Sequence, residues 1–79
     1  MNQRLAKLLA DVFRIRTIDV QPALRKEEVG SWDSLKQMDL VLSLEAEYAI
    51  LLEIPDILHM QSVSAIIEVL ERKGVNLEG

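Results

Sequence analysis

The sequence predicts an all-α protein, a four-helix bundle with three longer helices, one short third helix and a long first loop. Three segments repeat apolar residues at the three- and four-residue spacing of an amphipathic helix. The stretch between the first two of them lacks that spacing and contains proline and glycine. At 79 residues the chain is short enough to form one domain, so we expect a single unit over residues 1–79.

The first helix is predicted from about Asn2 to Arg14. Its apolar residues recur at intervals that place them on one stripe: Leu5, Leu8, Leu9, Val12 and Phe13. The segment from Ile15 to Asp33 is predicted to be a long connection, interrupted by Pro22 and Gly30 and attached to the core by Ile18, Leu24 and Val29. Loops of this length often serve a function.

Asp33 or Ser34 can cap the second helix, because both side chains accept hydrogen bonds from first-turn N–H groups. We expect its inward-facing residues to be Leu35, Met38, Val41, Leu42 and Tyr48, with Leu40 and Leu44 widening the apolar face.

A short third helix is predicted from Ile54 to Met60, because Pro55 is tolerated in a first turn. The fourth helix begins near Ser62 and ends at Lys73 and Gly74, a cation followed by a residue that accepts positive φ. Its apolar stripe is Val63, Ile66, Ile67 and Leu70.

Composition excludes several classes of function. With 13 acidic and 9 basic side chains, the net charge of −4 argues against a nucleic-acid partner. Cysteine is absent and His59 is the single histidine, which argues against a metal site and places His59 at the surface. No apolar run reaches the ~20 residues of a membrane span, so we expect a cytoplasmic monomer without membrane insertion.

The run Gly30-Ser31-Trp32-Asp33-Ser34-Leu35 opens the second helix after the long loop. It is followed by Met38-Asp39-Leu40-Val41-Leu42 and by Leu44-Glu45-Ala46-Glu47-Tyr48. Together these segments resemble the acyl carrier protein family, and the resemblance extends from about Leu5 to Lys73. Trp32 before the motif is similar to the specialised stand-alone carriers.

The resemblance implies that Ser34, flanked by Asp33 and Leu35, carries a 4′-phosphopantetheine arm taken from coenzyme A by a phosphopantetheinyl transferase. The terminal thiol of the arm would hold acyl groups as thioesters and present them to acyl-loading and acyl-processing enzymes. A helix N-terminus suits the phosphodiester, since its free N–H groups and dipole favour an anion. No general base adjoins Ser34 in the sequence, so we expect a carrier and not an enzyme, with no catalytic residues. Read without the resemblance, the same tripeptide is an ordinary helix cap.

In this family the second helix presents acidic side chains to basic rims on partner enzymes, and the matching positions are Asp33, Asp39, Glu45 and Glu47. The partner-binding residues that we predict are Lys36, Met38, Asp39, Glu45 and Glu47. Lys36 and Ala46 stand where fatty-acid-synthesis carriers usually have acids. These two departures favour a dedicated partner set in a specialised pathway over housekeeping fatty acid synthesis.

Five apolar side chains could line a cavity for the acyl chain: Met38, Val41, Leu42, Ile57 and Met60. The same residues could equally form plain core, and Trp32 could either stack on the arm or a partner or serve as a half-buried loop anchor. The cargo is left open among fatty acid, polyketide and specialised lipid intermediates, with an aminoacyl or peptidyl carrier and an unmodified helical adaptor as alternatives. A hydrolase using Ser34 lacks a base and an oxyanion-stabilising loop.

Overall fold

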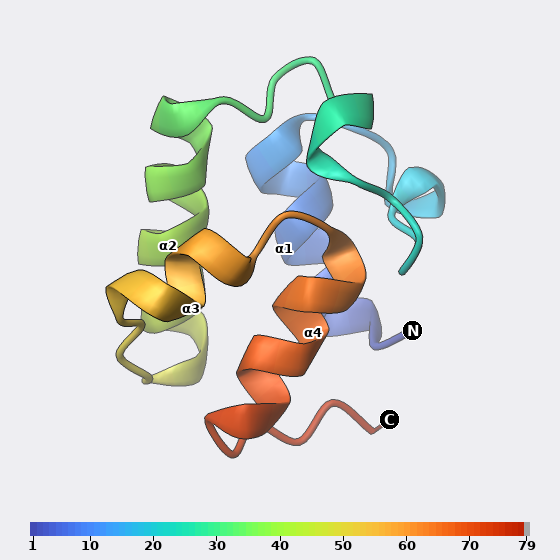
Figure 1. Ribbon diagram of the computed structural model, residues 1–79. Coiled ribbons are helices and arrows are strands. Elements are labelled where there is room, and N and C mark those ends of the chain that lie inside the picture. Colours follow the sequence, from blue (N-terminus) through green and yellow to red (C-terminus); the bar gives the residue numbers. More distant parts are fainter. Residues whose placement is uncertain (79) are drawn as a thin grey trace.

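The computed structural model describes residues 1–78, and its helices follow one another as the sequence predicts (Figure 1). The all-α fold class is confirmed, and within the described residues the nearest approach to a strand is one isolated bridge between Arg25 and Ser62. The elements are α1 (Gln3–Phe13), two short 3-10 helices η1 (Thr17–Asp19) and η2 (Lys26–Glu28), α2 (Ser34–Tyr48), the short α3 (Ile54–His59) and α4 (Val63–Arg72). None of these helices has the length and hydropathy needed to cross a lipid bilayer.

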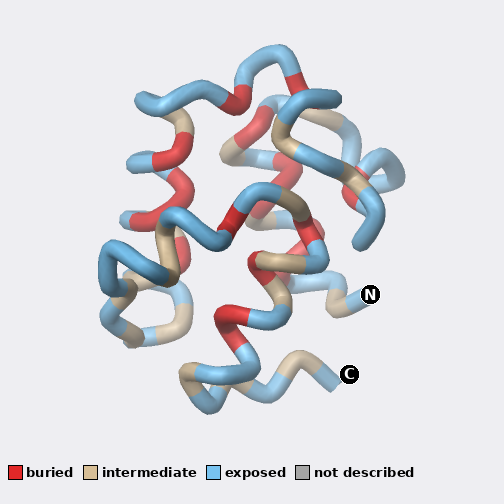
Figure 2. Tube along the Cα trace, viewed as in Figure 1, coloured by how far each residue is buried: buried red, intermediate tan, exposed pale blue. Residues whose placement is uncertain are grey.

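The core lies between the inner faces of α1, α2 and α4 (Figure 2). The stripes predicted for the first and last helices are confirmed, because their members are buried or partly buried. Each of the three longer helices begins at a side-chain cap, whose oxygen accepts a hydrogen bond from a first-turn N–H. The caps are Asn2, Asp33 and Ser62.

The inward face predicted for α2 is wrong at three of its seven residues, since Leu40, Val41 and Leu44 are buried and Tyr48 is partly buried. Leu35, Met38 and Leu42 are 79%, 51% and 62% exposed, whereas the buried residues of the helix are Gln37, Leu40, Val41 and Leu44. This helix carries two apolar stripes, and burying one of them necessarily leaves the other in solvent. The buried stripe contains a glutamine, so hydrophobicity alone also placed the members of the exposed stripe inside.

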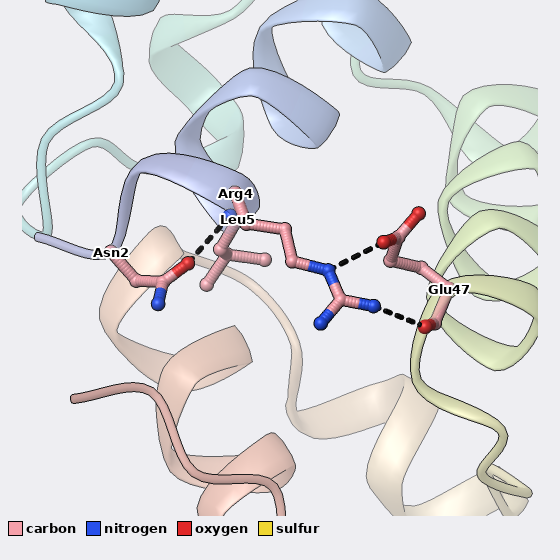
Figure 3. A network of polar contacts seen from close by, with 4 residues as sticks. All are labelled: Asn2, Arg4, Leu5 and Glu47. Atoms are coloured by element: carbon pink, nitrogen blue, oxygen red, sulfur yellow. Dashed lines mark hydrogen bonds and ion pairs between the residues drawn. The ribbon is translucent and has the colours of Figure 1, made fainter. Parts of the chain in front are cut away.

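Arg4 and the cap residue Asn2 join the start of α1 to other parts of the chain. Arg4 of α1 donates to both the carboxylate and the backbone carbonyl of Glu47 at the end of α2, and its guanidinium lies 4.8 Å from the centre of the Tyr48 ring (Figure 3). The side-chain amide of Asn2 donates to the carbonyl of Leu77, 3.4 Å away, which brings the two ends of the described chain together.

The long loop is attached to the start of α4 by backbone hydrogen bonds. The N–H groups of Val63 and Ser64 donate to the carbonyls of Leu24 and Pro22 at 2.9 and 3.0 Å, so the loop satisfies donors that a helix N-terminus leaves free. Val29 is buried and Leu24 partly buried, as the sequence predicts. The prediction for Ile18 is wrong, because its side chain is 72% exposed.

Helix α3 buries none of its residues and is held to the bundle partly through polar contacts. At its N-terminal end, the Lys73 ammonium lies 2.9 Å from the Asp56 carboxylate and 3.6 Å from that of Glu53. Asp56 also accepts a hydrogen bond from the backbone N–H of Glu53, which closes the first turn. The third helix is therefore anchored to the end of the fourth by charge.

These contacts predict how the attachment of α3 depends on pH. The backbone hydrogen bond from Glu53, and then the hydrogen bond from Lys73, hold the pKa of Asp56 below its ordinary value of 3.8. A carboxylate with a lowered pKa in the folded state stabilises it above the unfolded pKa and loses that contribution as the pH falls further. We expect the amide protection factors of α3, which compare its exchange with that of an unstructured chain at the same pH, to fall as the pH drops below about 4. Asp56→Asn should show part of that loss of protection already at neutral pH. Identical exchange in the variant and the wild type from neutral pH to pH 3 would contradict this.

Candidate functional site

Ser34 is the first residue of α2, and its side chain is exposed at the end of the long loop. The cap is Asp33, whose carboxylate accepts from the N–H of Lys36 at 2.8 Å, while its carbonyl accepts from the N–H of Gln37, also at 2.8 Å. Within residues 1–78, no protein acceptor receives a hydrogen bond from the N–H of Ser34 or Leu35. The hydroxyl therefore stands next to free donors at the positive end of a helix dipole, a setting that favours a phosphate.

The loop segment before Ser34 is fixed by two neighbouring residues. The hydroxyl of Ser31 donates to the carbonyl of Phe13 at 2.8 Å, which ties the loop to the end of α1. Trp32 is only 4% exposed and stacks on Phe13, with ring centroids 4.3 Å apart. The half-buried anchor expected for Trp32 is thus a fully buried one, and its ring is packed inside the protein. These contacts hold the loop in place and so give the exposed Ser34 a rigid base.

Gln37 connects this base to α3. Its side-chain oxygen accepts a hydrogen bond from the indole N–H of Trp32, and its amide nitrogen donates to the carbonyls of Ile57 and Met60 at 3.0 and 3.2 Å. Gln37 is 6% exposed and is the one polar residue among the buried side chains of the described chain. The hydrophobic pattern does not identify Gln37, because its side chain is polar. Its spacing of three, four and seven residues from Leu40, Val41 and Leu44 nevertheless places it on their stripe.

All four acids matched to the family's docking positions have contacts inside the protein. Asp33 caps α2, and Glu45 accepts from the backbone N–H of Leu52 at 2.9 Å and so fixes the chain after the helix. Glu47 is paired with Arg4 (Figure 3). Asp39 lies 3.7 Å from the ammonium of Lys36, a residue that itself reduces the negative charge of this face.

Apolar side chains dominate the solvent-facing side of α2 beside Ser34. Leu35, Met38 and Leu42 lie at spacings of three and four residues, so they form one exposed stripe, which we call the outer stripe. Further along the chain, Leu51, Ile54 and Leu58 are 80%, 72% and 68% exposed in and before α3. Six exposed large apolar side chains on a domain of this size indicate a surface that binds another molecule.

The five residues predicted to line an acyl cavity fall into two groups. Val41 and Met60 are core residues and Ile57 is partly buried between α3 and the core, whereas Met38 and Leu42 belong to the outer stripe. The structure therefore does not bring all five to one wall.

The arrangement offers Ser34 no partner for nucleophilic catalysis. His59 lies in α3 with its Nε2 3.3 Å from the carboxylate of Glu68, on an exposed surface. Residues 1–78 contain no group of three potential ligands that could hold a metal ion. The exposed hydroxyl beside free N–H groups is a setting suited to a phosphate-bearing group.

Comparisons with known proteins agree with this geometry. The family model described as "Phosphopantetheine attachment site" matches residues 3–70. The fold is similar to that of the holo acyl carrier protein from Geobacter metallireducens, determined in solution by NMR: the TM-score is 0.80 at 24% identity, over 92% of this chain and 86% of that chain. No curated relative matches at a significant level.

Proposed function

This chain belongs to the phosphopantetheine attachment-site family, whose members are non-catalytic carriers with a covalent 4′-phosphopantetheine group, and on that premise we propose that Ser34 is the attachment residue. The supporting observation is the exposed hydroxyl at the first position of α2, beside unpaired N–H groups and on a base fixed by Trp32 and Ser31. Asp33 shapes the turn as the cap, and Leu35 stands exposed on the other side.

The chain's own part in modification is to present the serine. The hydroxyl oxygen of Ser34 would form the new bond to the pantetheine phosphorus of coenzyme A, with the adenosine bisphosphate portion leaving and the hydroxyl proton passing to a base on the transferase. The free N–H groups of Ser34 and Leu35 then face the resulting phosphodiester anion. When attached, the arm supplies a thiol that holds acyl groups as thioesters.

We further propose that partner enzymes bind the face of α2 formed by Lys36, Met38 and Asp39, together with Leu35 and Leu42. Docking on this face would rely on apolar contact more than on charge, since the outer stripe is exposed and Lys36 opposes Asp39. Glu45 and Glu47 stay predictions as partner-binding residues. Such a surface suits enzymes with an apolar rim and fits a specialised acyl, polyketide or lipid pathway better than a partner set selected by acidic charge.

Intact mass spectrometry tests the proposal. The chain is incubated with coenzyme A, magnesium and a broad-specificity phosphopantetheinyl transferase, and should gain the mass of one phosphopantetheine. Peptide mapping should place it on Ser34. An unchanged mass would favour the unmodified adaptor, and a group on Ser31, Ser43, Ser62 or Ser64 would overturn the site.

The Lys36 departure predicts a kinetic effect. Lys36→Glu removes a cation beside Asp39 and adds an anion, so association with a carrier-dependent enzyme that has a basic docking rim should become severalfold faster at low salt. Stopped-flow binding at two salt concentrations measures this rate. Arg72→Glu is the control, because it changes the net charge equally at the last residue of α4, and the end of α4 lies far from the start of α2 (Figure 1). Equal acceleration by both variants would show a net-charge effect and no role for position 36.

A further inference from the structure

We infer that Gln37 is a specificity-determining residue that keeps the acyl chain outside the bundle by holding α3 against α2. The inference rests on the proposed function, because it concerns the cargo of the arm on Ser34. It is drawn from a different observation than the one that supports attachment at Ser34. The buried side-chain amide of Gln37 makes three hydrogen bonds that join the loop, the second helix and the third helix.

Gln37 lies between Ser34, where the arm is attached, and the apolar core. Its position on α2 is three residues after Ser34, or about one helical turn, and on the buried side of the helix. The two carbonyls that it holds, those of Ile57 and Met60, belong to the last turn of α3 and the residue that follows it. A chain passing inward between α2 and α3 must separate these groups.

Separating them leaves buried polar atoms without partners. The amide nitrogen of Gln37 and the carbonyl of Met60 would face the methylene groups of the chain, which cannot form hydrogen bonds. The carbonyl of Ile57 would keep only the N–H of Met60, 3.3 Å away. The indole N–H of Trp32 holds the side-chain oxygen of Gln37, so the amide cannot simply rotate away while Trp32 stays buried. Beneath it, Val41 and Met60 are packed with 4% and 0% exposure.

The outer stripe gives the cargo an alternative place. Leu35, Met38 and Leu42 begin directly after Ser34 and are exposed, so an apolar chain can rest there without opening the bundle. Cargo that is short, polar or handed directly to a partner enzyme suits this arrangement, and a long saturated chain that needs burial does not. Removal of the Gln37 hydrogen bonds should allow Val41, Ile57 and Met60, three of the five residues considered as a cavity lining, to shelter the acyl chain.

The test compares the wild-type chain with Gln37→Met, which has a similar volume and no hydrogen-bonding amide. Straight-chain acyl-phosphopantetheine groups of two to ten carbons are attached from the acyl-coenzyme A with the same transferase, and intact mass confirms loading. Gln61→Met is the matched control, since Gln61 also donates to an α3 carbonyl, that of Leu58 at 3.1 Å, from an exposed position. Thermal unfolding midpoints are measured for every chain length.

A chain that is buried only in the folded state raises the midpoint as it lengthens. We expect a rise of about 5 °C or more between two and ten carbons in Gln37→Met, and none in the wild type or in Gln61→Met. Equal slopes in the wild type and Gln37→Met, whether zero or positive, would overturn the inference. Failure to load any acyl arm would instead overturn the proposed function, so the two failures are distinguishable.

The wild-type chain decides the question if Gln37→Met does not unfold cooperatively. Methyl chemical shifts of Val41 and Met60 are then compared among wild-type samples loaded with two to ten carbons. Unchanged shifts support a closed bundle. Shifts that move progressively with chain length would show the chain inside it and overturn the inference.

Discussion

Ser34→Ala should gain no phosphopantetheine under conditions that modify the wild-type chain completely. The substitution removes only the hydroxyl group, and Asp33 remains to cap the helix, so the fold should be retained. Because position 34 is exposed, we expect the free energy of unfolding to change by no more than about 0.5 kcal/mol. Intact mass and a urea titration of the same sample measure both effects.

Ser31→Ala is the matched control, three residues earlier in the same loop. Its hydroxyl donates to the carbonyl of Phe13, so the variant should lose about 0.5–1.5 kcal/mol of stability while keeping full modification. The two serines thus separate the chemical role from the structural one. Residual modification of Ser34→Ala, or its loss in Ser31→Ala with the fold intact, would contradict the assignment of the site.

Leu40→Ala should destabilise the protein by about 2–5 kcal/mol, whereas Leu42→Ala should cost about 0.5 kcal/mol or less. Leu40 is fully buried and its truncation leaves a cavity in the core, but Leu42 is 62% exposed on the same helix. The two substitutions have nearly the same effect on helix propensity, so their difference isolates burial. It also decides which stripe of α2 faces the core.

Thermal unfolding measures this pair directly. In a domain of this size each 1 kcal/mol shifts the midpoint by roughly 4–8 °C, so the midpoint of Leu40→Ala should fall by about 10 °C or more. Leu42→Ala should unfold close to the wild type and should instead weaken binding to a partner enzyme. Comparable destabilisation by both variants would mean that α2 is rotated from its described orientation.

Local chemistry was sufficient to predict most of the elements. The stripes of the first and last helices, the caps Asp33 and Ser62, Pro55 in the first turn of α3 and Gly74 after α4 are signals carried by a few adjacent residues. The attachment motif is likewise local, because a serine at a helix start is recognised from its immediate neighbours. The helix signals were confirmed by the fold, and the family that the motif indicated was confirmed by the match over residues 3–70. Attachment at Ser34 stays a prediction.

The orientation of α2 could not be predicted in that way. Its sequence offers two apolar stripes, and the more hydrophobic choice included Leu35, Met38 and Leu42, which the structure leaves exposed. The choice depends on what α1 and α3 present across the helix. Only when Trp32, Ile57 and Met60 surround it can the amide of Gln37 satisfy its hydrogen bonds and enter the core.

The sequence by itself determined that this chain folds as a helical carrier with a serine at the start of its second helix, since spacing, caps and motif are properties of neighbouring residues. Tertiary structure decided which face of that helix meets solvent, that most of its acids are engaged within the protein, and how α3 is held. The physical reason is that these features depend on contacts between residues far apart in the sequence, such as Gln37 with Ile57 and Arg4 with Glu47, which are 20 and 43 residues apart. No local sequence pattern shows which distant residues the fold brings together.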